Sequence, residues 1–191
     1  PTPGPVRTRS PLNATLPAVP AERVPEVLAK YEGEIQELKI KVAEKGQSLT
    51  DDIARVAAAR DALPNARLKV DANMGYTLGG ALDALRKLCE YGIIYAEQPV
   101  ASIEDMAALR FAIAKERLPA RIAADESIRK AEDPLKVARA NAADLMVIKA
   151  APLGGVRRAL ALVEQAQLPA IVSSALESSV GIATGAFLAA S

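Results

Sequence analysis

The feature of this sequence that most constrains its fold is a repeated alternation between short β-type runs and amphipathic helical stretches. Such alternation is typical of a parallel sheet whose strands are joined and covered by helices. Beyond residue 25, the six remaining prolines fall between the apolar segments, where a residue without an amide proton does least harm. The seven expected strands are residues 13–18, 37–43, 67–72, 93–97, 121–125, 145–149 and 170–173.

The stretches between these runs carry helix-start signals. Ser48 and Asp51 have the spacing of a capping box, in which the two residues satisfy each other's free backbone amides. Asp133 followed by Pro134 predicts an N-cap with proline at the first helical position. We therefore expect helices to connect successive strands.

Polar residues at the strand ends favour a barrel over an open sheet. In a (β/α)8 barrel the carboxyl ends of all strands converge on one mouth, whereas an open doubly wound sheet uses only the strands near its switch point. Six successive runs here end, or nearly end, in a polar residue, at intervals of 24 to 30 residues. These residues are Lys41, Asp71, Glu97, Asp125, Lys149 and Ser173.

Strand parity supports the barrel. Alternation places Leu38 and Ile40 on one face of their strand, and Lys39 and Lys41 on the other. In a barrel the apolar face meets the helices and the lysines point inward. In a single strand, the same alternation would also be expected from an ordinary sheet whose charged face lies in solvent. The pattern recurs in several strands along the chain, which favours the barrel.

Composition excludes several kinds of chemistry and of partner. One cysteine and no histidine leave no internal disulfide, no ordinary zinc site and no His-dependent nucleophile. The 24 basic and 23 acidic residues are evenly spread, which predicts neither a nucleic-acid nor a membrane partner. No apolar run could span a bilayer and no signal-peptide pattern appears. We expect a soluble, cytoplasmic protein, monomer or homo-oligomer, that acts on a small molecule.

Asp71, Glu97 and Asp125 predict a metal site, because consecutive strands would bring the three carboxylates together. Their negative charges would repel by several kcal/mol even at an effective dielectric constant of about 20. Ligand sets made only of oxygen favour a hard divalent cation such as Mg²⁺. The alternative is that lysine or arginine neutralises the acids in structural ion pairs.

Lysines are the expected proton-transfer groups. A free lysine has a pKa of about 10.4 and is a poor base near neutral pH. A unit positive charge at roughly 6 Å would lower that pKa by about two units. Lys41 or Lys149 could then abstract a proton, unless these lysines only balance the acids.

A resemblance to a known family rests on five segments, namely Lys39-Ile40-Lys41, Val70-Asp71-Ala72-Asn73, Glu97-Gln98-Pro99, Ala124-Asp125-Glu126-Ser127 and residues 148–155. They resemble the successive signatures of the enolase superfamily, muconate-lactonising-enzyme subgroup. Within that subgroup, three segments are most similar to o-succinylbenzoate synthases of the actinobacterial type, namely residues 41–44, 149–152 and 173–178.

The resemblance implies an Mg²⁺-dependent lyase of menaquinone biosynthesis, with Asp71, Glu97 and Asp125 as metal ligands. Its substrate would be a carboxylate, 2-succinyl-6-hydroxy-2,4-cyclohexadiene-1-carboxylate. Lys41 would remove the proton beside the carboxylate and return it to the departing hydroxyl in a syn dehydration. Lys149 would stabilise the enediolate intermediate. The residues expected to support catalysis or contact the substrate are Lys39, Asn73, Ser173 and Ser174.

Members of the family also have an N-terminal capping domain, and their (β/α)7β barrel has an eighth strand. We find no segment of this sequence that corresponds to the capping domain or to the eighth strand. We therefore expect residues 1–10 to be a linker from a capping domain, and residues 11–191 to form an incomplete barrel with strands 1 to 7. One alternative function is an N-acylamino-acid racemase or dipeptide epimerase that uses both catalytic lysines as bases. Another is an inactive barrel fragment with a structural or binding role.

Overall fold

A computed structural model describes residues 7–191 and confirms the expected parallel sheet. Its seven strands are hydrogen-bonded in sequence order, and each lies within one of the expected runs. The strands are β1 (Ala14–Leu16), β2 (Glu37–Lys41), β3 (Arg67–Asp71), β4 (Ile93–Glu97), β5 (Arg121–Ala124), β6 (Leu145–Ile148) and β7 (Ala170–Val172).

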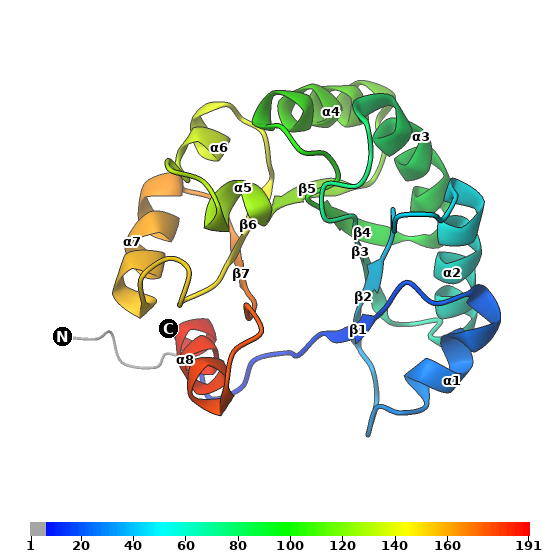
Figure 1. The fold of residues 1–191 in the computed structure, drawn as a ribbon, viewed down its shortest axis with the longest axis horizontal. Coiled ribbons are helices and arrows are strands. Elements are labelled where there is room, and N and C mark those ends of the chain that lie inside the picture. Colours follow the sequence, from blue (N-terminus) through cyan, green and yellow to red (C-terminus); the bar gives the residue numbers. More distant parts are fainter. Residues whose placement is uncertain (1–6) are drawn as a thin grey trace.

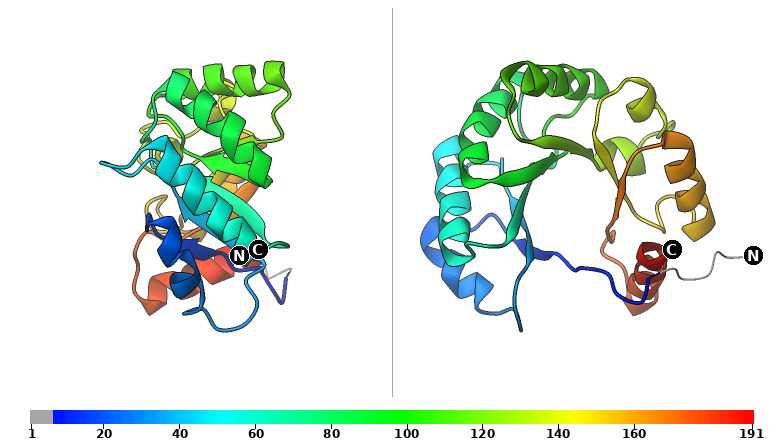
Figure 2. Two further views of the ribbon diagram at one scale, coloured as in Figure 1. Left: turned by 90° about the vertical axis from the view of Figure 1, so that its right-hand side faces the viewer. Right: turned by 180° about the vertical axis from the view of Figure 1, so that it is seen from behind.

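The sheet curls so that its strands line the inside and the helices cover the outside (Figures 1 and 2). Within residues 7–191 no strand joins β1 to β7, so the barrel is incomplete, as expected. No helix in this part of the chain has the length and apolar character needed to cross a membrane. The helices are η1 (Ala21–Arg23), α1 (Val24–Leu28), α2 (Leu49–Ala62), α3 (Leu78–Leu88), η2 (Cys89–Tyr91), α4 (Ile103–Glu116), α5 (Glu126–Arg129), α6 (Lys136–Arg139), α7 (Val156–Ala166) and α8 (Ser179–Ala190).

The expected linker over residues 1–10 falls partly outside the described residues, which begin at Arg7. Residues 7–10 form neither helix nor strand. The backbone amide of Arg7 donates a hydrogen bond to the carbonyl of Ala190, 3.1 Å away, so this segment lies beside the end of α8 (Figure 1). The boundary between linker and barrel remains a prediction.

The two faces of β2 are used as strand parity predicts. Leu38 and Ile40 are fully buried in the core between the sheet and the helices. Lys39 and Lys41 point the other way, and both contact Asp71. Register adds a second constraint, because Lys41 pairs with Asp71 and Asp71 with Glu97 across three adjacent strands. Parity and register together aim these side chains into the barrel.

One of the two helix starts is confirmed and the other is wrong. Ser48 caps α2 in a reciprocal capping box with Asp51, as predicted. Asp133 does not cap a helix, since α6 begins three residues later at Lys136, with Leu135 as its N-cap. The Asp133 carboxylate instead accepts the backbone amide of Leu135 at 3.2 Å. Such a local turn competes with helix formation, which explains the error.

A buried ion pair within α2 belongs to a hydrogen-bond network that joins this helix to the end of β2. Arg55 is 0% exposed and Asp52 is 1% exposed, with 2.9 Å between Nη1 of Arg55 and Oδ1 of Asp52. Arg55 also donates to the carbonyl of Val19 at 2.6 Å and to that of Lys41 at 3.0 Å. The other carboxylate oxygen of Asp52 accepts the Tyr76 hydroxyl at 2.6 Å. This network therefore fixes the backbone of Lys41 from outside the barrel.

Gly75 offers a stability test, because a side chain there has no room. A Cβ atom on Gly75 would meet the carbonyl oxygen of Ala43 at 2.6 Å and its Cβ at 2.7 Å. We expect Gly75→Ala to lower the free energy of unfolding by about 1–3 kcal/mol, as overpacking does. Urea unfolding followed by circular dichroism measures the change.

Gly79 is the matched control, because it lies in the first part of α3 and a Cβ there meets nothing within 4 Å. Gly79→Ala should raise the free energy of unfolding by about 0.5–1 kcal/mol, since alanine loses less backbone entropy on folding. Equal effects of the two substitutions would contradict the crowding described around Gly75.

Candidate active site

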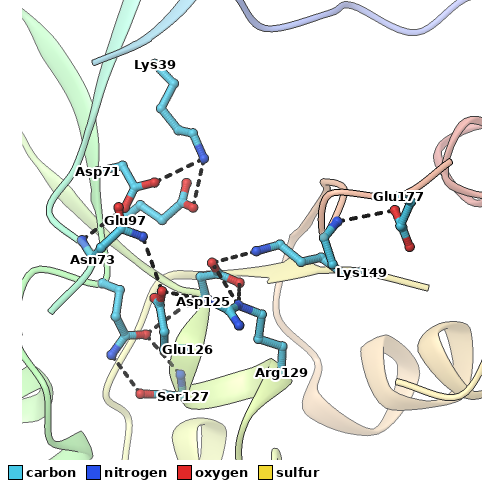
Figure 3. Close-up of polar contacts among 12 residues, drawn as sticks. Lys39, Asp71, Asn73, Glu97, Asp125, Glu126, Ser127, Arg129, Lys149 and Glu177 are labelled. Atoms are coloured by element: carbon cyan, nitrogen blue, oxygen red, sulfur yellow. Dashed lines mark hydrogen bonds and ion pairs between the residues drawn. The ribbon is translucent and has the colours of Figure 1, made fainter. Parts of the chain in front are cut away.

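Three buried carboxylates lie at the carboxyl ends of adjacent strands, as the sequence predicts (Figure 3). Asp71 ends β3, Glu97 ends β4, and Asp125 follows the last residue of β5. Their exposed fractions are only 1%, 1% and 2%. Charged residues are almost never buried to this extent unless they are paired. The arrangement therefore requires partners of opposite charge.

Two lysines of β2 supply part of that charge. The ammonium group of Lys39 lies 3.2 Å from Oδ2 of Asp71 and 3.0 Å from Oε1 of Glu97, so it bridges the two acids. The ammonium of Lys41 lies 2.6 Å from the same oxygen of Asp71 and 2.6 Å from Oδ1 of Asn73. The side chain of Lys41 is 31% exposed, twice the fraction of Lys39, and so is the more accessible of the two.

Lys149 pairs with the remaining acid. Its ammonium lies 2.7 Å from Oδ2 of Asp125, and its side chain is only 9% exposed. Lys39 and Lys149 reach the carboxylates from different sides (Figure 3). Arg129, one helical turn after Asp125, lies 3.2 Å from Oδ1 of that residue. The structure thus places two lysines of one strand at Asp71 and the third lysine at Asp125.

Burial and charge shift the pKa values of this cluster in different directions. Burial raises the pKa of Glu97 to about 7, and the negative charge of Asp71 adds to the rise. For Asp71, burial also favours the neutral form, but Lys39 and Lys41 outweigh it and the pKa lies below its ordinary value. Lys39 loses solvation on burial, yet Glu97 and Asp71 together raise its pKa. Of Asp71 and Glu97, Glu97 is thus the acid whose negative charge is less compensated.

The donor chemistry of these acids fits a hard divalent cation. All three offer only oxygen, which Mg²⁺ prefers. Oδ1 of Asp125 is buried and accepts no hydrogen bond from residues 7–191, although Nε of Arg129 lies 3.2 Å from it. The charges of Asp71 and Asp125 both disfavour ionisation of Glu97. As the side chains stand, however, no three acidic, cysteine or histidine residues within residues 7–191 are grouped at metal-binding spacing. The lysine ion pairs are the arrangement that the structure shows.

The two predicted substrate contacts, Ser173 and Ser174, lie just after β7. They line a cavity of about 800 Å³ together with Lys39, Tyr95 and Glu97. Ser173 is half-buried and Ser174 is exposed. Of the lysine and carboxylate cluster, Lys39 and Glu97 border this cavity, whereas Lys41 and Lys149 do not line it. The role of the serines as hydrogen-bond donors stays a prediction.

Three residues at the site were not predicted. The side-chain oxygen of Gln98 accepts the backbone amides of Asp125 at 3.0 Å and of Ser127 at 3.1 Å, and it is fully buried. Glu126 and Arg129 form an ion pair of 2.9 Å beside Asp125. The spacing of Asp125 and Arg129, four residues apart, is a signal that could have indicated their contact on a helix.

Comparisons with known proteins agree with this geometry. Residues 21–191 match the family described as "Enolase C-terminal domain-like". The chain is 54% identical over its whole length to an o-succinylbenzoate synthase of Mycolicibacterium smegmatis. It is 48% identical over 98% of its length to an o-succinylbenzoate synthase of Thermobifida fusca. It spans 57% of each of these two relatives.

Solved structures show the same fold. A mandelate racemase/muconate lactonizing family protein from Azoarcus sp. EbN1 superposes with a TM-score of 0.82 at 31% identity, covering 98% of this chain and 50% of that one. A dipeptide epimerase from Enterococcus faecalis V583 superposes with a TM-score of 0.84 at 28% identity, covering 98% of this chain and 54% of that one. The arrangement of strands is therefore shared with enzymes that are about twice as long.

Proposed function

Because this chain belongs to the Enolase C-terminal domain-like family, we propose that the protein carrying it is an o-succinylbenzoate synthase. The observation that carries the proposal is the meeting of Lys41 and Lys149 with three buried carboxylates at one end of the barrel. The two relatives at 48% and 54% identity support this choice of reaction. Its substrate would be 2-succinyl-6-hydroxy-2,4-cyclohexadiene-1-carboxylate.

In the proposed reaction, Lys41 is the acid/base catalyst. Its ammonium is the more accessible of the two on β2, and it lies at the rim of the carboxylate cluster. In its neutral form Lys41 would take the proton beside the substrate carboxylate and later give it to the departing hydroxyl on the same face. Lys149 is nearly buried against Asp125 and would stay charged, so that it stabilises the negative charge left by proton removal.

We further propose that Asp71, Glu97 and Asp125 hold Mg²⁺. When bound, this ion would supply a positive charge that stabilises the additional negative charge on the substrate carboxylate after the neighbouring carbon has lost its proton. The residues of the chain would contribute oxygen ligands and a dry, charged pocket. The half-buried Ser173 would orient the distal part of the substrate from the cavity wall.

The direct test of the proposed function is a comparison of two substrates. The whole protein is incubated with the cyclohexadiene carboxylate and, separately, with an N-succinylamino acid. We expect faster turnover of the first. Faster racemisation of the second would favour a racemase or epimerase, an alternative to which the structural match to a dipeptide epimerase lends support. In that case Lys41 and Lys149 would act as opposed bases.

Mg²⁺ binding gives a separate prediction, measured by isothermal titration calorimetry. Asp125→Asn should weaken Mg²⁺ binding at least about tenfold, because affinity depends on the charge of the ligands. Glu104→Gln removes an exposed acid that pairs with Lys136, and it should leave the affinity unchanged. Circular dichroism checks that both variants fold. Equal binding by both variants would favour an inert barrel segment, in which the acids serve only as partners of lysine.

A further inference from the structure

A hydrogen-bonded chain leads from Lys41 to a residue outside the proposed catalytic set. Oδ1 of Asn73 accepts from the ammonium of Lys41 at 2.6 Å. The amide nitrogen of Asn73 donates to Oε1 of Glu126 at 3.2 Å (Figure 3). Glu126 has no described contact with Lys41. Its hydrogen-bonded route to Lys41 runs through Asn73.

The orientation of the Asn73 amide depends on Glu126. An ammonium group can only donate and an ionised carboxylate can only accept, so only one orientation of the amide satisfies both neighbours. Asn73 is exposed, and water could otherwise satisfy its side chain in either orientation. The backbone of Asn73 is held separately, because its backbone amide donates to Oδ1 of Asp71 at 3.1 Å. Glu126 thus selects the orientation that points the amide oxygen at Lys41.

Glu126 is itself held in place. It is the first residue of α5 and is 5% exposed. Nη2 of Arg129 lies 2.9 Å from the same Oε1 that accepts from Asn73. One carboxylate oxygen therefore receives two donors, one from its own helix and one from the loop after β3. The position of the buried Glu126 carboxylate is therefore fixed by Arg129, and Asn73 donates to a carboxylate that is already oriented.

We infer that Glu126 is a positioning residue for Lys41, acting through the Asn73 amide. This inference rests on the proposed function only in naming Lys41 as the acid/base catalyst. Glu126 orients the amide, and the amide oxygen fixes where the ammonium of Lys41 stands relative to Asp71. A small displacement of a catalytic group is enough to reduce turnover by one or two orders of magnitude.

A double-mutant cycle in the whole protein tests the inference. Glu126→Ala and Asn73→Ala should each lower kcat roughly 10- to 100-fold, with KM changed less than about threefold. The double variant should be no slower than the slower single variant, because both substitutions break the same chain. Glu126→Gln keeps an acceptor oxygen and should retain kcat within about threefold. Mg²⁺ affinity should be unchanged in all of these variants.

Two additions keep the inference separate from the proposed function. Glu104→Ala, at an exposed acid, is the matched control and should keep wild-type kcat. The ¹⁵N resonance of the Lys41 ammonium, assigned by its loss in Lys41→Arg, should shift in Glu126→Ala, with no further shift when Asn73→Ala is added. A wild-type protein that does not turn over the carboxylate would refute the proposed function alone. An unshifted Lys41 resonance, or additive losses of kcat in an active enzyme, would overturn the role of Glu126.

Discussion

Lys41→Ala is expected to lower kcat for the cyclohexadiene carboxylate about 10²- to 10⁴-fold, the range that general acid/base groups contribute. The alanine variant lacks the amine proposed to take the substrate proton, although the carboxylates and Lys149 are still present. KM should change little, because the loss affects the transition state more than substrate binding. Steady-state assays of dehydration, at saturating Mg²⁺, measure both constants.

Two further variants show whether the loss reflects chemistry or charge. Lys41→Arg keeps a positive charge beside Asp71, but a guanidinium does not lose its proton near neutral pH, so this variant should be as slow as Lys41→Ala. Lys87→Ala removes an exposed lysine of α3 that forms an ion pair with the exposed Glu90, and kcat should be unaffected. Near-normal turnover by Lys41→Arg would mean that Lys41 serves as a counter-ion and that another residue is the base.

Arg55→Ala should give the largest loss of stability, about 3–5 kcal/mol, because it leaves the carboxylate of Asp52 buried without its ionic partner. It also removes the donors to the carbonyls of Val19 and Lys41. A loss of this size is a large part of the total stability of a domain. Urea unfolding, followed by circular dichroism at several protein concentrations, measures it.

Arg23→Ala is the control for that experiment. Arg23 and Glu26 have the same i,i+3 spacing as Asp52 and Arg55, but both side chains are 54% exposed. Exposed pairs contribute little, so the unfolding midpoint of Arg23→Ala should match that of the wild type. If the two arginine variants lost similar amounts of stability, burial would not be the reason for the importance of Arg55.

Much of the fold follows from local sequence patterns. All seven strands were located, because short apolar runs between proline-containing loops leave few other assignments. The inward side chains were also predicted, since parity depends only on the two-residue period of a strand. The start of α6 was wrong, because the side chain of Asp133 bonds a nearby amide instead of capping a helix. Local competition of this kind depends on backbone geometry that a sequence pattern does not contain.

The site was predicted less completely than the fold. Lys39, Lys41, Asp71 and Glu97 meet because they occupy adjacent strands, and order along the chain predicts this. Arg55 was missed, because composition rules place arginine at the surface and its burial depends on partners from three separate segments. The link between Asn73 and Glu126 joins residues 53 positions apart, and no periodicity relates them.

The pairing of Lys41 with Asp71, and of Asp71 with Glu97, makes the chemistry of this protein sensitive to deletions and insertions within strands. One extra residue early in β3 would turn Asp71 toward the helices and aim Val70 at the inside of the barrel, with the architecture otherwise intact. Insertions in the loops would leave the register of Lys41, Asp71 and Glu97 unchanged. Insertions within β2, β3 or β4 would not, because each of these side chains must point into the barrel.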